Sequence, residues 1–258
     1  MLLPHAVSRL RTARLARSTT QFLARGGPHG GRCAGCRLLP SYCICAFRPL
    51  VTTRAAICLL MSDVEPLKPS NTGWLIADIV PDTFAFAWAR TEVDPALLLL
   101  LADPQWQPYV VFPGEFVAPE RVVNDILRSE NGLERGGEKP AQENISKRPL
   151  FILLDATWSE ARKIFKKSPY LDHFPVLSLQ VAQISRYRLR RSKRDEHFCT
   201  AEVAALCMEL AGETHAAHIL EAYLDVYTEH YLRAKQQQKL HLDDEIHQRL
   251  LSLSSRQK

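Results

Sequence analysis

Long apolar runs are absent from this sequence. Its most apolar stretch, residues 97–102, falls far short of the roughly 18 to 20 residues that a membrane-spanning helix requires. A large net charge is absent as well, because 33 Lys and Arg residues against 28 Asp and Glu residues leave only +5. With 46% hydrophobic and 24% charged residues, the composition predicts an ordinary globular protein without a membrane partner. The 258 residues suffice for one α/β domain with small appendages.

Acidic residues are missing from the first 32 positions, which contain six arginines. A second basic cluster occupies residues 186–194. Two such clusters in an otherwise balanced chain indicate contact with a polyanion. An acid-free, Arg-containing start is also typical of a mitochondrial transit peptide, which stays an alternative. We favour the first interpretation because the segment runs directly into a cluster of cysteines.

The cysteine count is odd, at seven, which argues against a simple disulfide framework. Four of the seven follow the pattern CxxC, six residues, CxC within residues 33–45. Four thiolates at this spacing suit tetrahedral zinc, and a closed set of four predicts a structural rather than a catalytic site. A redox pair is the alternative. Clustered, unpaired cysteines favour a reducing compartment, the cytoplasm. The predicted zinc ligands are Cys33, Cys36, Cys43 and Cys45.

Short apolar runs alternate with helical segments from residue 50 onward. Continuous apolar runs predict strands that are covered on both faces, at residues 55–61, 83–88, 109–112, 150–154 and 176–179. Helices are expected at residues 71–79, 95–102, 119–129 and 158–167, and in the tail at 199–211 and 214–253. The alternation predicts a mainly parallel sheet with helices on both faces. A basic amphipathic helix is expected at residues 6–24, and the polar residues 129–148 are interpreted as a surface insertion.

Three polar segments, residues 62–73, 155–158 and 187–202, follow predicted strands. Ligands bind at the carboxyl ends of the strands in open α/β sheets, so these segments are candidates for the functional site. Each also has a plain structural interpretation. Ser70, Asn71, Asp155 or Thr157 could cap a helix, with Trp158 packed into the core. The charges of the third segment could belong to a solvated loop.

The ordered set of motifs resembles the DTW-domain family, and more closely its bacterial tRNA-uridine aminocarboxypropyltransferase branch. The matching stretches are the cysteine pattern, EPLKPSNTG (65–73), DATW (155–158) with SEARK (159–163), KSPYL (167–171), YRLR (187–190) and CTAEVA (199–204). Family members usually have Gly where this chain has Ala156. The resemblance implies a SPOUT-like α/β fold with a C-terminal trefoil knot, a DTW catalytic domain over residues 50–235, a zinc knuckle within 1–49 and a helical tail over 236–258.

The resemblance also implies an activity. S-adenosylmethionine would donate its 3-amino-3-carboxypropyl group to N3 of a uridine in the variable loop of tRNA, with 5′-methylthioadenosine as by-product. Expected catalytic residues are Asp155, as base or as the group that orients the uracil edge, with Thr157 and Trp158. Donor-binding residues would be Ser70, Asn71, Thr72, Asp155, Thr200 and Glu202. Basic side chains expected to hold tRNA are Arg14, Arg17, Lys68, Arg186, Arg188 and Arg190.

Two other functions remain open at this point. A SPOUT-type RNA methyltransferase would use the same donor, and a zinc-ribbon RNA-binding adaptor would use the knuckle and arginines without catalysis. The polar segments after the strands argue against the adaptor, which has no use for them. Zinc is expected to be structural, no obligate protein partner is evident, and the chain could act as a monomer or a homodimer.

Overall fold

A single parallel sheet organises the computed structural model, which describes residues 4–18, 31–124, 126, 147–179 and 198–255. Its strands are β1 (Ala56–Met61), β2 (Thr83–Ala87), β3 (Trp106–Val111), β4 (Val122–Val123), β5 (Arg148–Asp155) and β6 (Val176–Leu177). They lie in the order β2-β1-β5-β3-β6-β4, and every neighbouring pair is parallel. The predicted parallel α/β class is therefore confirmed. The trefoil knot and the domain boundaries stay predictions.

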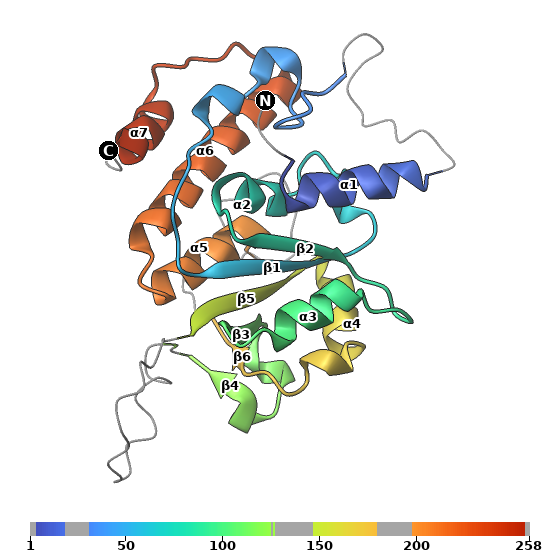
Figure 1. Cartoon of the computed structure of the whole chain (residues 1–258). Coiled ribbons are helices and arrows are strands. Elements are labelled where there is room, and N and C mark those ends of the chain that lie inside the picture. The colour runs from blue at the N-terminus through green and yellow to red at the C-terminus, as the bar shows by residue number, and fades with distance from the viewer. Residues whose placement is uncertain (1–3, 19–30, 125, 127–146, 180–197, 256–258) are drawn as a thin grey trace.

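Helices cover both faces of this sheet (Figure 1). One face carries α1 (Ala6–Ala16), α2 (Gly73–Ile79), α5 (Thr200–Leu210) and α6 (Thr214–Gln236), with α7 (Glu245–Ser254) against α6. The other face carries α3 (Pro95–Ala102) and α4 (Trp158–Lys166). Strand β1 shows why: Ile57, Leu59 and Met61 face the first helix layer, and the alternating Ala56, Cys58 and Leu60 face the second.

The cysteine knuckle, residues 31–49, packs beside α6 and above α2 (Figure 1). Its turns include the 3-10 helices Pro40–Tyr42 and Cys45–Phe47. Cys36, Leu38 and Ile44 are fully buried in the same core cluster as β1 and α2. The knuckle is thus part of the main hydrophobic core.

One predicted helix is wrong, another is divided into two helices, and a third is shorter than expected. Residues 119–121 form a 3-10 turn and 122–123 form β4, because Pro119 opens a tight turn and the β-branched Val122 and Val123 favour a strand. The helix expected over residues 214–253 is interrupted after α6, where Gln237 adopts the left-handed conformation (φ 56°), and α7 begins at Glu245. Helix α1 ends at Ala16 rather than at residue 24, with residues 19–24 outside the described range.

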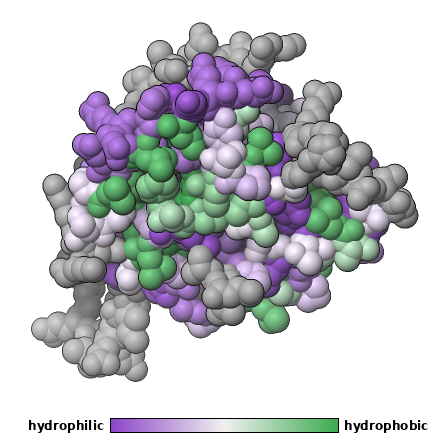
Figure 2. Space-filling view, turned by 90° about the horizontal axis from the view of Figure 1, so that it is seen from above, coloured by the Kyte–Doolittle hydropathy of each residue, from purple (hydrophilic) through white to green (hydrophobic). Residues whose placement is uncertain are grey.

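The surface seen from above is of mixed character. Hydrophilic side chains gather along one edge and hydrophobic ones near the middle of this face (Figure 2). Among the residues that the structure describes, no helix is both long enough and apolar enough to cross a membrane.

A buried carboxylate on α2 makes stability depend on pH. Asp78 is 4% exposed, accepts a hydrogen bond from Tyr223 (3.1 Å) and lies 3.1 Å from the Arg48 guanidinium. Burial raises the pKa of Asp78 to about 6, although Arg48 opposes the shift. Because this folded-state pKa lies above the roughly 3.9 of an unfolded Asp, the stabilisation from the bound proton is present below pH 4 and lost as pH rises through 6.

Asp78→Asn removes this titration while keeping an acceptor for Tyr223. We expect the free energy of unfolding of the variant, relative to wild type, to rise by about 3 kcal/mol between pH 4 and pH 8, as two pKa units imply. Urea unfolding at several pH values measures this difference. Exposed Asp172→Asn is the control and should show no such trend. A difference that stays constant with pH for Asp78→Asn would refute the assignment.

Candidate functional site

The loops after β1 and β5 leave the sheet in opposite directions. After β1 the chain enters α2 in one helix layer, and after the neighbouring β5 it enters α4 in the other. In open α/β folds, adjacent loops that diverge in this way mark a topological switch point, and ligands usually bind in a crevice between such loops. Two of the three candidate segments, residues 62–73 and 155–158, therefore meet at one switch point.

Asp155, the last residue of β5, lies at the centre of this region and is fully buried. Its Oδ2 accepts a hydrogen bond from Asn71 Nδ2 at 2.7 Å, and its Oδ1 accepts one from Thr200 Oγ1 at 2.7 Å. The same Asn71 amide lies 3.3 Å from Glu65 Oε2, a second buried carboxylate that also binds Lys68 Nζ at 2.7 Å. Asp155 thus joins the loop after β1 to the start of α5.

The first residue of α2, Gly73, permits this arrangement. A Cβ at Gly73 would lie 2.5 Å from Asp155 Oδ2 and 3.2 Å from Leu59 Cδ1. Only a residue without a side chain lets the carboxylate approach the helix this closely. The position also brings the negative charge to the amino end of α2, where the helix dipole favours it.

Gly73→Ala should therefore displace the Asp155 side chain and break its bond to Asn71. We expect a loss of about 1 to 3 kcal/mol in the free energy of unfolding, typical of an inserted methyl group in a packed interior. Chemical unfolding measures this loss. Gly31→Ala is the matched control, because a Cβ there meets nothing within 4 Å. Equal stability of the two variants would show that the close approach to Asp155 is unimportant.

The amino end of α5 is tied to the same loop. Thr72 Oγ1 accepts a hydrogen bond from the Ala201 amide (3.3 Å), and Glu202 Oε2 accepts one from the Cys199 amide (2.7 Å). Thr72 is fully buried and Glu202 nearly so. Of the donor-binding residues predicted from the sequence, Asn71 and Thr200 bind Asp155 directly. Thr72 and Glu202 bind the backbone at the start of α5, and Ser70 lies in the same loop as Asn71 and Thr72.

Thr157 and Trp158 lie where β5 passes into α4. Thr157 caps α4: its Oγ1 accepts from the Glu160 amide (3.4 Å), and its own amide donates to Glu160 Oε2 (3.1 Å), a reciprocal capping box. Trp158 is 37% exposed and its indole stacks on Phe112, with ring centroids 5.6 Å apart. The capping role considered for Thr157 is confirmed, whereas Trp158 keeps part of its surface open to solvent.

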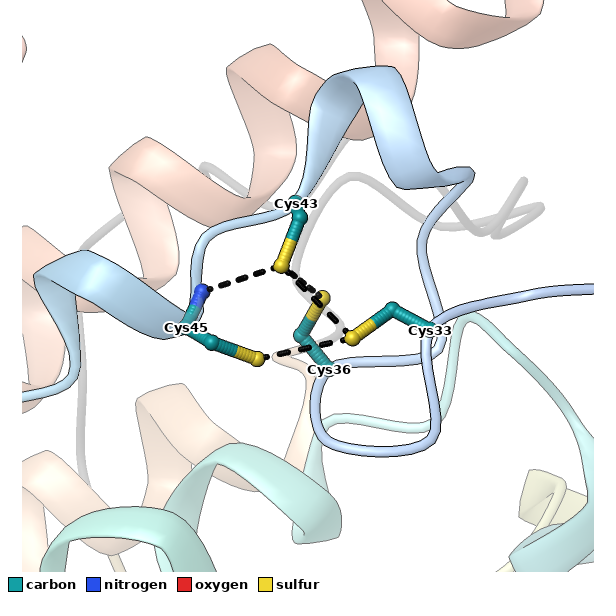
Figure 3. A group of neighbouring side chains, drawn as sticks. All are labelled: Cys33, Cys36, Cys43 and Cys45. Carbon is teal, nitrogen blue, oxygen red and sulfur yellow. Dashed lines mark hydrogen bonds between the residues drawn. The ribbon is translucent and has the colours of Figure 1, made fainter.

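The four predicted zinc ligands converge in the knuckle (Figure 3). Their sulfur atoms all lie within 4.8 Å of one another. The Cys33–Cys45 and Cys33–Cys43 separations are 3.6 Å, and Cys36–Cys43 is 3.7 Å. Zinc–sulfur bonds of about 2.3 Å in a tetrahedron place sulfurs about 3.8 Å apart, so the four thiols fit one zinc ion.

Zinc binding would change the protonation of these thiols. Burial raises the pKa of Cys36 to about 11. For Cys33 burial acts in the same direction, but hydrogen bonds from the Cys36 and Gly35 amides outweigh it and hold the pKa at about 7. Thiolates are the ligands that zinc requires, so a bound ion would displace the protons that the buried thiols otherwise keep.

Arg37 connects the knuckle to the switch point. This residue adopts the left-handed conformation (φ 65°) and is only 3% exposed. Its guanidinium donates hydrogen bonds to the carbonyl oxygens of Lys68 and, at 2.8 Å, Asn71, and lies 4.2 Å from the Trp74 ring. Trp74 in turn donates its indole N–H to the Gly35 carbonyl (2.8 Å). A continuous set of contacts therefore runs from the cysteines through Arg37 and Asn71 to Asp155.

These segments have a counterpart among known families. A family model described as the DTW domain matches residues 30–232 of the chain. The chain belongs to the DTW-domain family. That family is known for tRNA modification. No solved structure matches the chain.

The basic residues predicted to bind tRNA do not form one cluster among the described residues of this DTW-domain protein. Arg14, on α1, pairs with Asp63 at 2.8 Å, and Arg17 is the exposed C-cap of α1. Lys68 pairs with Glu65. Arg186, Arg188 and Arg190 lie outside the described residues. Their roles in RNA binding stay predictions.

Three features of the DTW-domain protein were missed in the sequence. Arg37 directly follows a predicted zinc ligand, but nothing in its neighbours signals burial of a guanidinium. Glu65 is the first residue of the EPLKPSNTG motif, and its place in that motif could have identified it as a candidate site residue. Gly73 ends that motif, and a single glycine in a sequence does not indicate which side chain approaches it closely.

Proposed function

We propose that this DTW-domain protein transfers the 3-amino-3-carboxypropyl group of S-adenosylmethionine to N3 of an unpaired uridine in tRNA. The observation that supports this most strongly is the Asp155 cluster at the switch point, where motifs far apart in sequence join around one buried carboxylate. The family match supplies tRNA modification as the general role. The reducing conditions that clustered free thiols require favour action in the cytoplasm.

The proposed reaction is a nucleophilic substitution at the γ-carbon of S-adenosylmethionine. Uridine N3 attacks the γ-carbon of the methionine arm, a new N–C bond forms, and the γ-carbon–sulfur bond breaks. The sulfur leaves with the bonding electrons as neutral 5′-methylthioadenosine, and the N3 proton passes to solvent. Because three carbons are bonded to the sulfonium, the orientation of the donor selects the carbon that reacts. The target base must be unpaired, since N3 is engaged in Watson–Crick pairing in a duplex.

The protein's residues would supply orientation. Both carboxylate oxygens of Asp155 are engaged by Asn71 and Thr200, so in this proposal Asp155 positions those two groups and does not itself receive the proton. Ser70, Thr72 and Glu202 would complete the wall that holds the donor's amino-acid arm. Trp158, with its partly exposed ring, would contact the uracil beside this wall.

Incubation of the purified protein with unmodified tRNA and carboxyl-labelled S-adenosylmethionine tests the proposal. The label should appear on the RNA, with one methylthioadenosine released for each label incorporated. Mass spectrometry of the nucleosides distinguishes the alternatives, since an aminocarboxypropyl group adds about seven times the mass of a methyl group. Methyl incorporation without label would indicate a methyltransferase. Neither product, with tRNA binding retained, would indicate an adaptor.

A further inference from the structure

Helix α4 presents a row of cations on its exposed side. Two series of residues, each with a spacing of four, lie on one side of this helix: 158, 162 and 166, and 159, 163 and 167. Ala161 and Ile164 occupy the opposite, buried side. Six residues line a hollow of about 370 Å³ on this surface: Trp158, Ser159, Arg162, Lys163, Lys166 and Lys167. We call these six residues the α4 groove.

The charge of the α4 groove is not compensated by acidic partners. Within the described part of the chain, none of its four cations forms an ion pair. The one acidic residue of the helix, Glu160, is engaged by Thr157 at the helix start, and that hydrogen bond lowers the pKa of Glu160. Uncompensated positive charge in a concave surface attracts anionic ligands.

Aromatic rings lie directly beneath and beside these cations. The Arg162 guanidinium is 4.9 Å from the Phe116 ring, and Lys163 Nζ is 5.9 Å from the Trp88 ring. Trp158, Phe112 and Phe165 form a stack in which the last two rings are 4.3 Å apart. Cations beside an exposed aromatic ring are the combination that binds single-stranded nucleic acid, through phosphates and base stacking. An acidic protein surface would match the charge but would have no need of the ring stack.

The position of the α4 groove fits this partner. The groove begins at Trp158, next to the switch point, and follows a nine-residue helix that is about 13 Å long. A strand whose target base enters the crevice would continue along α4. We propose that the α4 groove binds the single-stranded RNA backbone that flanks the modified uridine. This inference rests on the proposed function for the identity of the RNA.

Lys166 and Lys167 offer the cleanest test, because they lie at the end of α4 that is farthest from the crevice and have no ion partner among the described residues. The double variant Lys166→Gln/Lys167→Gln should bind unmodified tRNA about tenfold more weakly at 150 mM salt. The slope of log affinity against log salt should fall by about 1.5, since two phosphate contacts are lost. The kcat at saturating tRNA should be unchanged and the KM for tRNA raised.

The matched control is Lys235→Gln/Lys239→Gln, which removes the same charge from exposed lysines at the end of α6. This control should keep wild-type affinity and salt slope. If both double variants bind tRNA equally, or if the Lys166/Lys167 variant binds it as wild type does, the α4 groove does not hold RNA. Binding is measured without S-adenosylmethionine. A protein that needs the α4 groove for tRNA but transfers no label would therefore contradict the proposed function alone.

Discussion

Asp155→Ala should lower transfer to tRNA by at least about 100-fold, whereas Asp155→Asn should lower it by only about tenfold. Alanine leaves the Asn71 amide and the Thr200 hydroxyl without the acceptor that orients them. Asparagine can still accept from Asn71 through its carbonyl oxygen and donate its amide to the Thr200 oxygen, so the geometry persists while the charge is lost. Single-turnover kinetics with saturating tRNA and S-adenosylmethionine measures both losses.

The pH profile separates positioning from proton transfer. If Asp155 were the general base, the acidic limb of the kcat/KM profile would disappear in the Asn variant. A positioning residue leaves that limb where it is in wild type and changes only the height of the profile. Exposed Asp172→Asn serves as control and should match wild type throughout. If the Asn variant is as inactive as the Ala variant while its fold and tRNA affinity are intact, Asp155 acts as the general base.

Loss of the metal should have the largest effect on stability. We expect Cys43→Ser, or treatment with a strong chelator, to lower the melting temperature by about 10 °C or more, which corresponds to about 3 to 5 kcal/mol for a chain of this size. The reason is that Leu38 and Ile44, between the ligands, are fully buried in the main core. Arg37 and Trp74 would also lose their fixed contacts with the knuckle and loop 65–72.

Calorimetry and metal analysis measure the two parts of this prediction. Wild type should contain about one zinc ion per chain, and the Cys43→Ser variant should lose both the zinc and the catalytic activity. Cys207→Ala is the control, because Cys207 is a buried thiol of α5 outside the cysteine cluster. It should keep the metal and lose little stability. A metal-free wild-type protein with an unchanged melting temperature would rule out a structural zinc site.

Strand positions could be predicted because fully covered strands are continuously apolar. The runs near β1 and β5 stand out for this reason. The four cysteines of the knuckle, Cys33, Cys36, Cys43 and Cys45, have a spacing that local turns alone can satisfy. The order of the strands could not be predicted. Strand β5 lies between β1 and β3 although it follows both in sequence, and this insertion depends on packing between distant segments.

The chemistry of the site could be predicted only in part, because it also depends on packing between segments that are distant in the sequence. The sequence marks Asp155 as a residue after a strand, but its alternation along β5 turns the carboxylate towards α2 and α5 and away from solvent. The burial of Arg37 depends on carbonyl groups more than 30 residues away. The cations of α4 could have been found from their helical spacing, since the capped helix itself was predicted.

A crystal structure of the protein with S-adenosylmethionine and a uridine-containing tRNA fragment tests the central claim most directly. The donor should occupy the crevice between the loops after β1 and β5, with its amino-acid arm beside Asn71 and Thr200. Its γ-carbon, rather than its methyl group, should point towards the base next to Trp158. A donor bound at the opposite edge of the sheet, or one that presents its methyl group to the RNA, would contradict the account.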